Sequence, residues 1–171
     1  VEPEKIEAKL DTIYDLASLT KVLVTTLLCA KLIENGEIDL SDKISHYFSE
    51  FETDEKRGIR IENLLTHTSG FQAWMPFYLS SDSTPELFEA IASQPLENPI
   101  NSKVVYSDFN FITLCFLLER IYEKPLDKIA QTEIFNPLNL KNTFFNPPKS
   151  FQKQTAASEF SNEYEKNTCI E

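Results

Sequence analysis

The sequence predicts a mainly helical domain, and two features of the chain lead to that prediction. Residues 16–35 and 109–122 are strongly apolar segments of helical length. Shorter segments with helix start signals accompany them, while stretches that could form strands are few. A chain of 171 residues is long enough to bury a sizeable core, so residues 1–171 are expected to form one domain. Five or six helices would build it around the two apolar ones.

The first long segment is expected to be a helix from about Leu16 to Asn35. Asp15 is a candidate N-cap, and Gly36 suits the left-handed position that follows the end of a helix. Apolar side chains cover nearly every side of this segment, which is typical of a buried helix. Its longest uncharged run, residues 22–30, is too short to cross a bilayer, so the chain is not expected to span a membrane.

Three shorter elements are expected after this helix. Ser41 or Asp42 can cap a short helix that ends near Phe48. Residues 51–58 are mostly charged and are expected to form an exposed loop. Residues 59–65 begin with alternating polarity and continue as one or two helical turns.

Two helices that begin beside a proline are expected in the second half of the chain. Thr84 is expected to cap a helix over residues 85–92, with Pro85 at its first position. Pro125 opens a helix that ends at about Phe135, where an Asn-Pro pair follows.

The second apolar helix, residues 109–122, lies between these two, and Ser107 or Asp108 can cap it. The two ends of the chain, residues 1–11 and 148–171, are polar and weakly patterned. They are expected to be loop or disordered.

Composition and charge argue against several function classes. The net charge of −11 argues against nucleic-acid binding, because phosphate contacts need lysine and arginine. Cys29, Cys115 and Cys169 show no disulfide pattern, and the first two lie in apolar helical runs where buried, reduced thiols are expected. With two histidines in the chain, a His/Cys zinc site is not expected.

Ser18 and Lys21 form a candidate nucleophile and base at the start of the first helix. Residues three apart on a helix share a face, and the positive end of the helix dipole favours the negative charge of a reacting hydroxyl. Burial of this helix would lower the pKa of the Lys21 amine, as a base requires. The alternative is an ordinary surface serine and lysine on an amphipathic helix.

Three segments in this order resemble the serine β-lactamase-related family, which includes class C β-lactamases, low-molecular-weight penicillin-binding proteins and many esterases. The resemblance covers roughly residues 11–145. The segments are Ala17-Ser18-Leu19-Thr20-Lys21, Leu64-Leu65-Thr66-His67-Thr68-Ser69-Gly70 and Tyr106-Ser107-Asp108.

The resemblance implies a role for each matching residue. Ser18 is the acylated nucleophile, Lys21 accepts its proton, and Tyr106 shares the proton shuttle and protonates the leaving group. Asp108 takes a substrate-binding position where relatives often have Asn; an ionised Asp cannot donate a hydrogen bond, so it pairs with Lys21 or caps the helix. His67 belongs to a structural turn. No metal or organic cofactor is implied.

The resemblance also implies parts that this sequence lacks. Relatives carry a Lys-Thr-Gly or His-x-Gly strand that completes the oxyanion hole, and no such motif follows Tyr106. The chain therefore resembles the helical region of an α+β β-lactamase/transpeptidase-like fold without most of its sheet. It begins at Val1 rather than Met, and we expect a fragment that alone hydrolyses little. Apolar surface that a sheet would cover is expected to promote self-association.

The leading hypothesis is a serine hydrolase that acts through an acyl-enzyme on an ester, a β-lactam or a cell-wall peptide. The first alternative is a catalytically inactive relative that serves as a binding or scaffolding module. Asp108 and the missing strand motif favour that alternative. A third hypothesis, an unrelated helical interaction module, requires the three segments to arise by chance.

Overall fold

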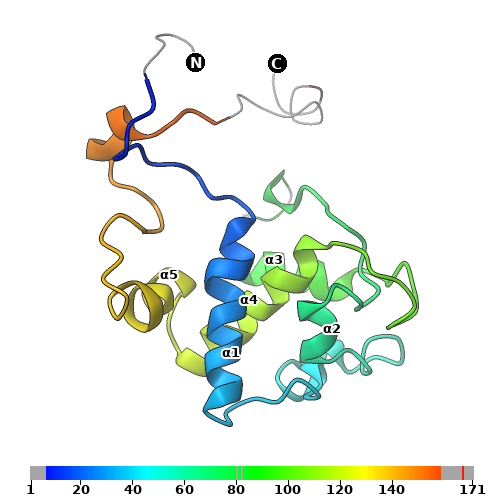
Figure 1. Cartoon of the computed structure of the whole chain (residues 1–171). Helices are drawn as coiled ribbons and strands as arrows, with labels where there is room; N and C mark the ends of the chain where they lie inside the picture. Colours follow the sequence, from blue (N-terminus) through cyan, green and yellow to red (C-terminus); the bar gives the residue numbers. More distant parts are fainter. Residues whose placement is uncertain (1–6, 80, 82, 159–166, 168–171) are drawn as a thin grey trace.

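A computed structural model describes residues 7–79, 81, 83–158 and 167 of the chain, without the side chain of residue 78. The described residues are mainly helical, as predicted, and their only β pairing is two isolated bridges. Figure 1 shows the α-helices gathered into one body. The helices are α1 (Thr26–Glu34), α2 (Ile61–Leu65), α3 (Thr84–Ser93), α4 (Asp108–Tyr122) and α5 (Leu126–Ala130).

Helix α4 lies at the centre of this body. The helical segment before α1 and helices α2, α3 and α5 all pack against it (Figure 1). Phe109, Leu114 and Leu117 are almost fully buried along its length, and Phe109 meets the ring of Phe71 edge to face at 5.8 Å. Burial of such side chains is the main stabilising contribution to a fold of this size.

Helix α1 begins later than the sequence predicts. The chain becomes helical at Leu19 rather than Leu16, because Ala17 has a left-handed φ of +43° that interrupts the helix. The Asp15 carboxylate accepts a hydrogen bond from the Ala17 N–H at 2.8 Å, so it supports this turn instead of capping a helix at Leu16. A π-helical segment, Lys21–Thr25, then leads into α1.

The predicted end of α1 is confirmed. Asn35 is the C-cap, and Gly36 has a φ of +72°. The Gly36 N–H bonds to the Ile33 carbonyl and the Glu37 N–H to the Leu32 carbonyl, at 3.0 and 2.9 Å. This pair of bonds is a Schellman motif, which satisfies two of the carbonyls at the helix end.

The expectation that this first helix is buried on all sides is wrong. Leu28, Cys29 and Leu32 are fully buried, but other apolar side chains of the same helix are about half exposed. Apolarity alone did not decide burial, because the described part of the chain packs against one side of the helix. The exposed side chains are Leu19, Val22, Leu23 and Leu27.

The helix expected to end near Phe48 is also absent. Two 3₁₀ turns, Ile44–His46 and Ser49–Phe51, take its place. The Ile44 N–H bonds to the Ile59 carbonyl at 3.0 Å, and Lys43 forms an antiparallel bridge with Arg60. This pairing holds the chain extended where a helix would have begun.

The loop over residues 51–58 is less exposed than its charges indicate. Phe51 is fully buried against Phe48, Phe71 and Phe88. Lys56 is also buried, and its ammonium donates to the Ala92 carbonyl in the last turn of α3. Desolvation lowers the pKa of Lys56, and the long aliphatic stem allows the residue to lie in the core.

The predicted starts of the later helices shift by at most one residue. Ser83, not Thr84, is the N-cap of α3, and its hydroxyl accepts from the Glu86 N–H at 3.4 Å. Ser107 occupies the N-cap position of α4 without a capping side-chain bond. Helix α5 continues as a π-helix, Gln131–Phe135, so the predicted end near residue 135 is confirmed.

The expected loop over residues 148–171 is partly structured. A 3₁₀ helix, Lys149–Gln154, precedes Thr155, which forms a parallel bridge with Ile13 in the N-terminal segment. The rest of both predicted ends, residues 1–6 and most of 159–171, lies outside the described residues. Within the described ranges, every helix is too short or too polar to span a membrane.

Candidate active site

Ser18 lies in the turn that immediately precedes the first helix. Its carbonyl accepts the Lys21 N–H at 3.0 Å, which brings the two side chains to the same face. The Lys21 Nζ donates to the Ser18 Oγ, also at 3.0 Å, so the structure brings the predicted pair into direct contact. Among the described residues, no hydrogen bond is made by the Ser18 N–H, which leaves that donor available at the site.

Lys21 is the first residue of the π-helical segment. Its carbonyl accepts both the main-chain N–H of Thr26 and the Thr26 hydroxyl, the latter at 2.9 Å. π-Helical turns are uncommon and are often found at functional sites. The Lys21 side chain is 16% exposed, so its amine lies at the edge of the protein interior beside the exposed Ser18.

Asp108, the first residue of α4, reaches the same amine. Its Oδ1 lies 2.7 Å from the Lys21 Nζ. The contact is an ion pair and not a well-directed hydrogen bond, because this buried oxygen has no hydrogen-bond partner of good geometry in the described part of the chain. One of the two roles left open for Asp108, pairing with Lys21, is therefore present.

The charge state of Lys21 differs from the prediction. Burial lowers the pKa of the amine, as expected, but the interactions of the amine with the Asp108 carboxylate and with Tyr106 outweigh burial and raise the pKa above its ordinary value. At neutral pH Lys21 is therefore an ammonium, and it donates to Ser18. In this protonated form the amine cannot accept a proton from Ser18.

Tyr106 lies over this amine. The Lys21 Nζ is 5.1 Å from the centroid of the Tyr106 ring, within the range of a cation–π contact. The tyrosine is 54% exposed, so its ring is accessible from solvent. Two segments that are far apart in the sequence, residues 18–21 and 106–108, thus meet around the Lys21 amine.

The turn over residues 67–73 fixes the start of α4 at this place. The Ser107 hydroxyl donates to the Gln72 carbonyl at 2.6 Å, and the Asp108 N–H donates to the Ala73 carbonyl at 2.9 Å. Gly70 has a φ of +94°, and an added Cβ would lie 2.1 Å from the Asn98 carbonyl oxygen. Only glycine fits this position, which explains the Gly70 of the motif.

His67 occupies the turn as expected and also contacts the site. Its ring centroid lies 4.7 Å from that of Tyr106. Its Nδ1 accepts the Ser107 N–H at 3.1 Å, and its carbonyl accepts the Val105 N–H at 2.9 Å. The sequence placed His67 in a structural turn, and the structure adds that this turn holds both neighbours of Tyr106.

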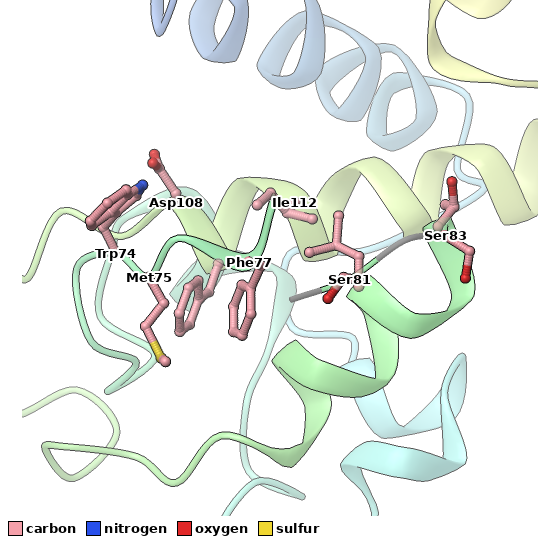
Figure 2. Close-up of a pocket in the computed structure, with 10 residues that line it drawn as sticks. Trp74, Met75, Phe77, Ser81, Ser83, Asp108 and Ile112 are labelled. Atoms are coloured by element: carbon pink, nitrogen blue, oxygen red, sulfur yellow. The ribbon is translucent and has the colours of Figure 1, made fainter. Parts of the chain in front are cut away.

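A cavity of about 430 Å³ opens beside Asp108 (Figure 2). Its lining is mostly apolar and includes Trp74, Met75 and Ile112, with Asp108 at one end. Trp74 lines this cavity and is 41% exposed, whereas Phe77 lines it but is nearly buried against Phe109.

Possible metal ligands do not gather in this region. The described residues contain no cluster of three or more His, Cys, Asp and Glu side chains that could hold a metal ion. Cys29 and Cys115 carry free thiols, and burial raises the pKa of each to about 12. Such thiols are poor nucleophiles, and Cys169 lies outside the described residues.

The chain is similar to proteins of one known family. The model of the family described as "Beta-lactamase" matches residues 3–166. A Salmonella paratyphi B protein named "Putative D-alanyl-D-alanine carboxypeptidase" is 39% identical over 156 residues, which cover 83% of this chain and 36% of that protein. The chain therefore spans about a third of the length of the curated relatives it matches.

Two solved structures share the fold. A beta-lactamase/D-alanine carboxypeptidase from Yersinia pestis, complexed with citrate, is 24% identical with a TM-score of 0.75; the match covers 91% of this chain and 47% of that one. A class C beta-lactamase is 19% identical with a TM-score of 0.78, and the match covers 88% and 42%. At these identities the likeness shows the fold alone, and the matched part is the helical region of the larger fold.

Proposed function

The chain belongs to the beta-lactamase family, and from this membership we propose that it carries the nucleophile region of a serine hydrolase that forms an acyl-enzyme. Ser18 is the nucleophile, Lys21 is the base, and Tyr106 is the second proton-transfer group. The observation that carries the proposal is the 3.0 Å contact between the Ser18 Oγ and the Lys21 Nζ. A base within hydrogen-bond reach of its hydroxyl is the geometric requirement for this chemistry.

The proposed reaction uses each of these groups in turn. The Ser18 oxygen attacks the substrate carbonyl and transfers its proton to neutral Lys21. The bond to the leaving group then breaks, Tyr106 supplies a proton to the departing atom, and the Lys21 ammonium returns a proton to Tyr106. Water later hydrolyses the ester at Ser18. The unpaired Ser18 N–H is suited to be one donor to the developing oxyanion.

Asp108 moves the pH dependence of this reaction further toward alkaline pH. Its carboxylate stabilises the Lys21 ammonium across a 2.7 Å ion pair, and the raised pKa of Lys21 reduces the fraction of neutral amine near pH 7. The rate of Ser18 acylation is therefore expected to rise as the pH approaches the pKa of Lys21.

The substrate is an ester, a β-lactam or a cell-wall peptide. The name of the Salmonella relative, a D-alanyl-D-alanine carboxypeptidase, favours a peptide that ends in D-alanine. Asp108 favours an ester, because an ionised carboxylate cannot donate to a substrate amide. The apolar cavity beside Asp108 is suited to an apolar part of either substrate. Rates on a D-alanyl peptide and on the ester analogue of the same sequence separate the two.

We also propose that residues 1–171 alone turn over substrate slowly. The curated relatives are about three times as long, and no Lys-Thr-Gly or His-x-Gly motif follows Tyr106. Loss of one oxyanion donor typically lowers the rate by about 10²- to 10³-fold. Equal turnover by this chain and by a version extended to the length of its relatives would contradict this proposal.

The alternative is a catalytically inactive relative that binds ligands without hydrolysing them. The Lys21–Asp108 ion pair favours it, because it holds the proposed base in its protonated form. In this case a substrate would occupy the cavity beside Asp108 and leave unchanged.

Covalent labelling of Ser18 tests the proposed function. The chain is treated with a fluorophosphonate or a labelled penicillin, and the adduct is measured by intact mass. A single adduct that is lost in Ser18→Ala supports the nucleophile. Ser49→Ala, at another exposed serine, is the matched control and should keep the adduct. A well-folded version of the chain, extended to the length of its relatives, that forms no adduct at any pH would favour the inactive relative.

A further inference from the structure

We propose that His67 is a positioning residue, whose unprotonated Nδ1 holds in place the short segment that carries Tyr106 and Asp108. The effect of His67 on catalysis rests on the proposed function, whereas its effect on the position of the segment does not. The residues on either side of Tyr106 are both hydrogen-bonded to His67. The His67 carbonyl accepts the Val105 N–H, and the His67 ring accepts the Ser107 N–H.

His67 contacts Tyr106 and both of its neighbours in the chain. The residue before it and the residue after it are both bonded to His67, at 2.9 and 3.1 Å. The histidine ring packs against the Tyr106 ring with a centroid separation of 4.7 Å and an interplanar angle of 41°. The next residue, Asp108, begins α4, so the same contacts determine where its carboxylate meets Lys21.

The main-chain donor determines which nitrogen of His67 carries the proton. The Ser107 N–H can only donate, so Nδ1 must accept, and the proton of the neutral ring lies on Nε2. The Asn110 side chain agrees, because its NH₂ then faces Nδ1 at 3.2 Å while its oxygen accepts the Ser69 hydroxyl at 2.5 Å. Two independent donors therefore point at one unprotonated nitrogen.

Protonation of Nδ1 would break this arrangement. The added proton would face the Ser107 N–H and the Asn110 NH₂, and both hydrogen bonds would be lost. Burial and the nearby Lys21 ammonium lower the pKa of His67, while Asp108 opposes them by raising it; the Tyr106 and Phe111 rings are its other neighbours.

The lowered pKa sets the direction of the pH effect. Since the folded protein disfavours the proton, the stability that neutral His67 contributes is fully present above its ordinary pKa of 6.5. It is lost as the pH falls through the lowered pKa. Acidification is thus expected to release the Tyr106 segment.

The tautomer and its titration are measurable on the chain without any substrate. The chain has two histidines, so a ¹H–¹⁵N long-range NMR spectrum of wild type and of His46→Gln assigns both rings. The expected result is a neutral His67 protonated on Nε2 at pH 7, with Tyr106 ring resonances that shift at the same pH at which His67 titrates. A proton on Nδ1, or Tyr106 ring resonances that do not shift when His67 titrates, would overturn the proposal.

Two substitutions separate positioning from general packing. His67→Asn places an amide oxygen near the position of Nδ1, cannot titrate, and tolerates the left-handed φ of +59°. His67→Gln places its amide further along the side chain, near the position of Nε2. Both variants lose the ring contacts, but they differ in where the amide lies and in how well the residue tolerates a positive φ. The Asn variant should keep the Tyr106 resonances near their wild-type positions across the acidic range, and the Gln variant should not.

The labelling rate of Ser18 then reports the catalytic consequence. Relative to wild type above pH 7, His67→Gln should label about tenfold more slowly or worse, while His67→Asn recovers most of the rate and lacks the loss that follows His67 protonation. Equal rates in the two variants would refute the positioning role. If wild type shows no labelling, the proposed function fails, and the NMR titration alone decides whether His67 positions the segment.

Discussion

Helices α1 and α4 are both strongly apolar, but their surroundings differ. Helix α4 is covered from several directions, and Leu114, Leu117 and Leu118 are fully buried. Helix α1 is covered on one side, and Leu27 near its start is 47% exposed. The site lies where the two helices begin, at the boundary between the covered and the uncovered regions. The comparison shows that a serine–lysine contact can form at the start of a helix whose own packing is incomplete.

The largest expected effect compares one leucine from each helix. Leu114→Ala in α4 should lower the free energy of unfolding by about 2–5 kcal/mol, because it leaves a cavity in a fully packed region. Leu27→Ala in α1 should change it by less than about 0.5 kcal/mol, since the side chain is half exposed. Urea denaturation measures both. Similar losses would mean that α1 is covered in solution.

A second pair compares the turn that ends α1 with the turn that anchors α4. Gly70→Ala adds left-handed strain and a clash with the Asn98 carbonyl, for a combined loss of about 3 kcal/mol. Gly36→Ala adds only the strain, about 1–2 kcal/mol, because nothing lies within 4 Å of the new Cβ. Thermal unfolding by circular dichroism ranks the two. A smaller loss of stability in Gly70→Ala than in Gly36→Ala would show that the turn near Asn98 relaxes easily.

Asp108→Asn changes the electrostatics that α4 imposes on the start of α1. Loss of the carboxylate removes a cause of the raised pKa of Lys21, so more of the amine is neutral at a given pH. The rise of Ser18 labelling with pH should therefore move to lower pH in this variant. Asp127→Asn, on α5, is a control that should leave the profile in place. An unchanged pH profile of labelling in Asp108→Asn would show that the ion pair does not control the protonation of the base.

The smallest expected effect concerns the exposed side of the first helix. The half-exposed Val22 and Leu27 favour weak self-association of the chain. Lysine at both positions should lower the mean molar mass in sedimentation equilibrium at high protein concentration. Leu40→Lys, at a similarly exposed leucine elsewhere, is the matched control. An equal decrease in that control would exclude this side of the helix as the contact surface.

Features set by neighbouring residues were predictable. The contact between Ser18 and Lys21 follows from a spacing of three residues at the start of a helix, and the structure brings these atoms together as expected. The end of α1 at Gly36 follows from the left-handed conformation that glycine tolerates. The meeting of Tyr106 and Asp108 with this pair was predicted from the family resemblance and not from local pattern.

Features set by distant contacts were not predictable. The pairing of Ile44 with Ile59 replaced an expected helix by 3₁₀ turns, and the core accepted Lys56 from a segment that reads as an exposed loop. The predicted pKa of Lys21 had the wrong sign, because the sequence indicates burial of the helix but not the carboxylate that α4 brings to within 2.7 Å.

By itself, the sequence determined the helical class, the C-terminal ends of the main helices and the serine–lysine pair. Each of these depends on backbone preferences and side-chain spacing within a few residues. The tertiary structure alone decided which side of the first helix is covered, the charge of Lys21 and the surroundings of His67. These depend on desolvation and Coulomb interactions between groups that only folding brings within a few ångströms of one another.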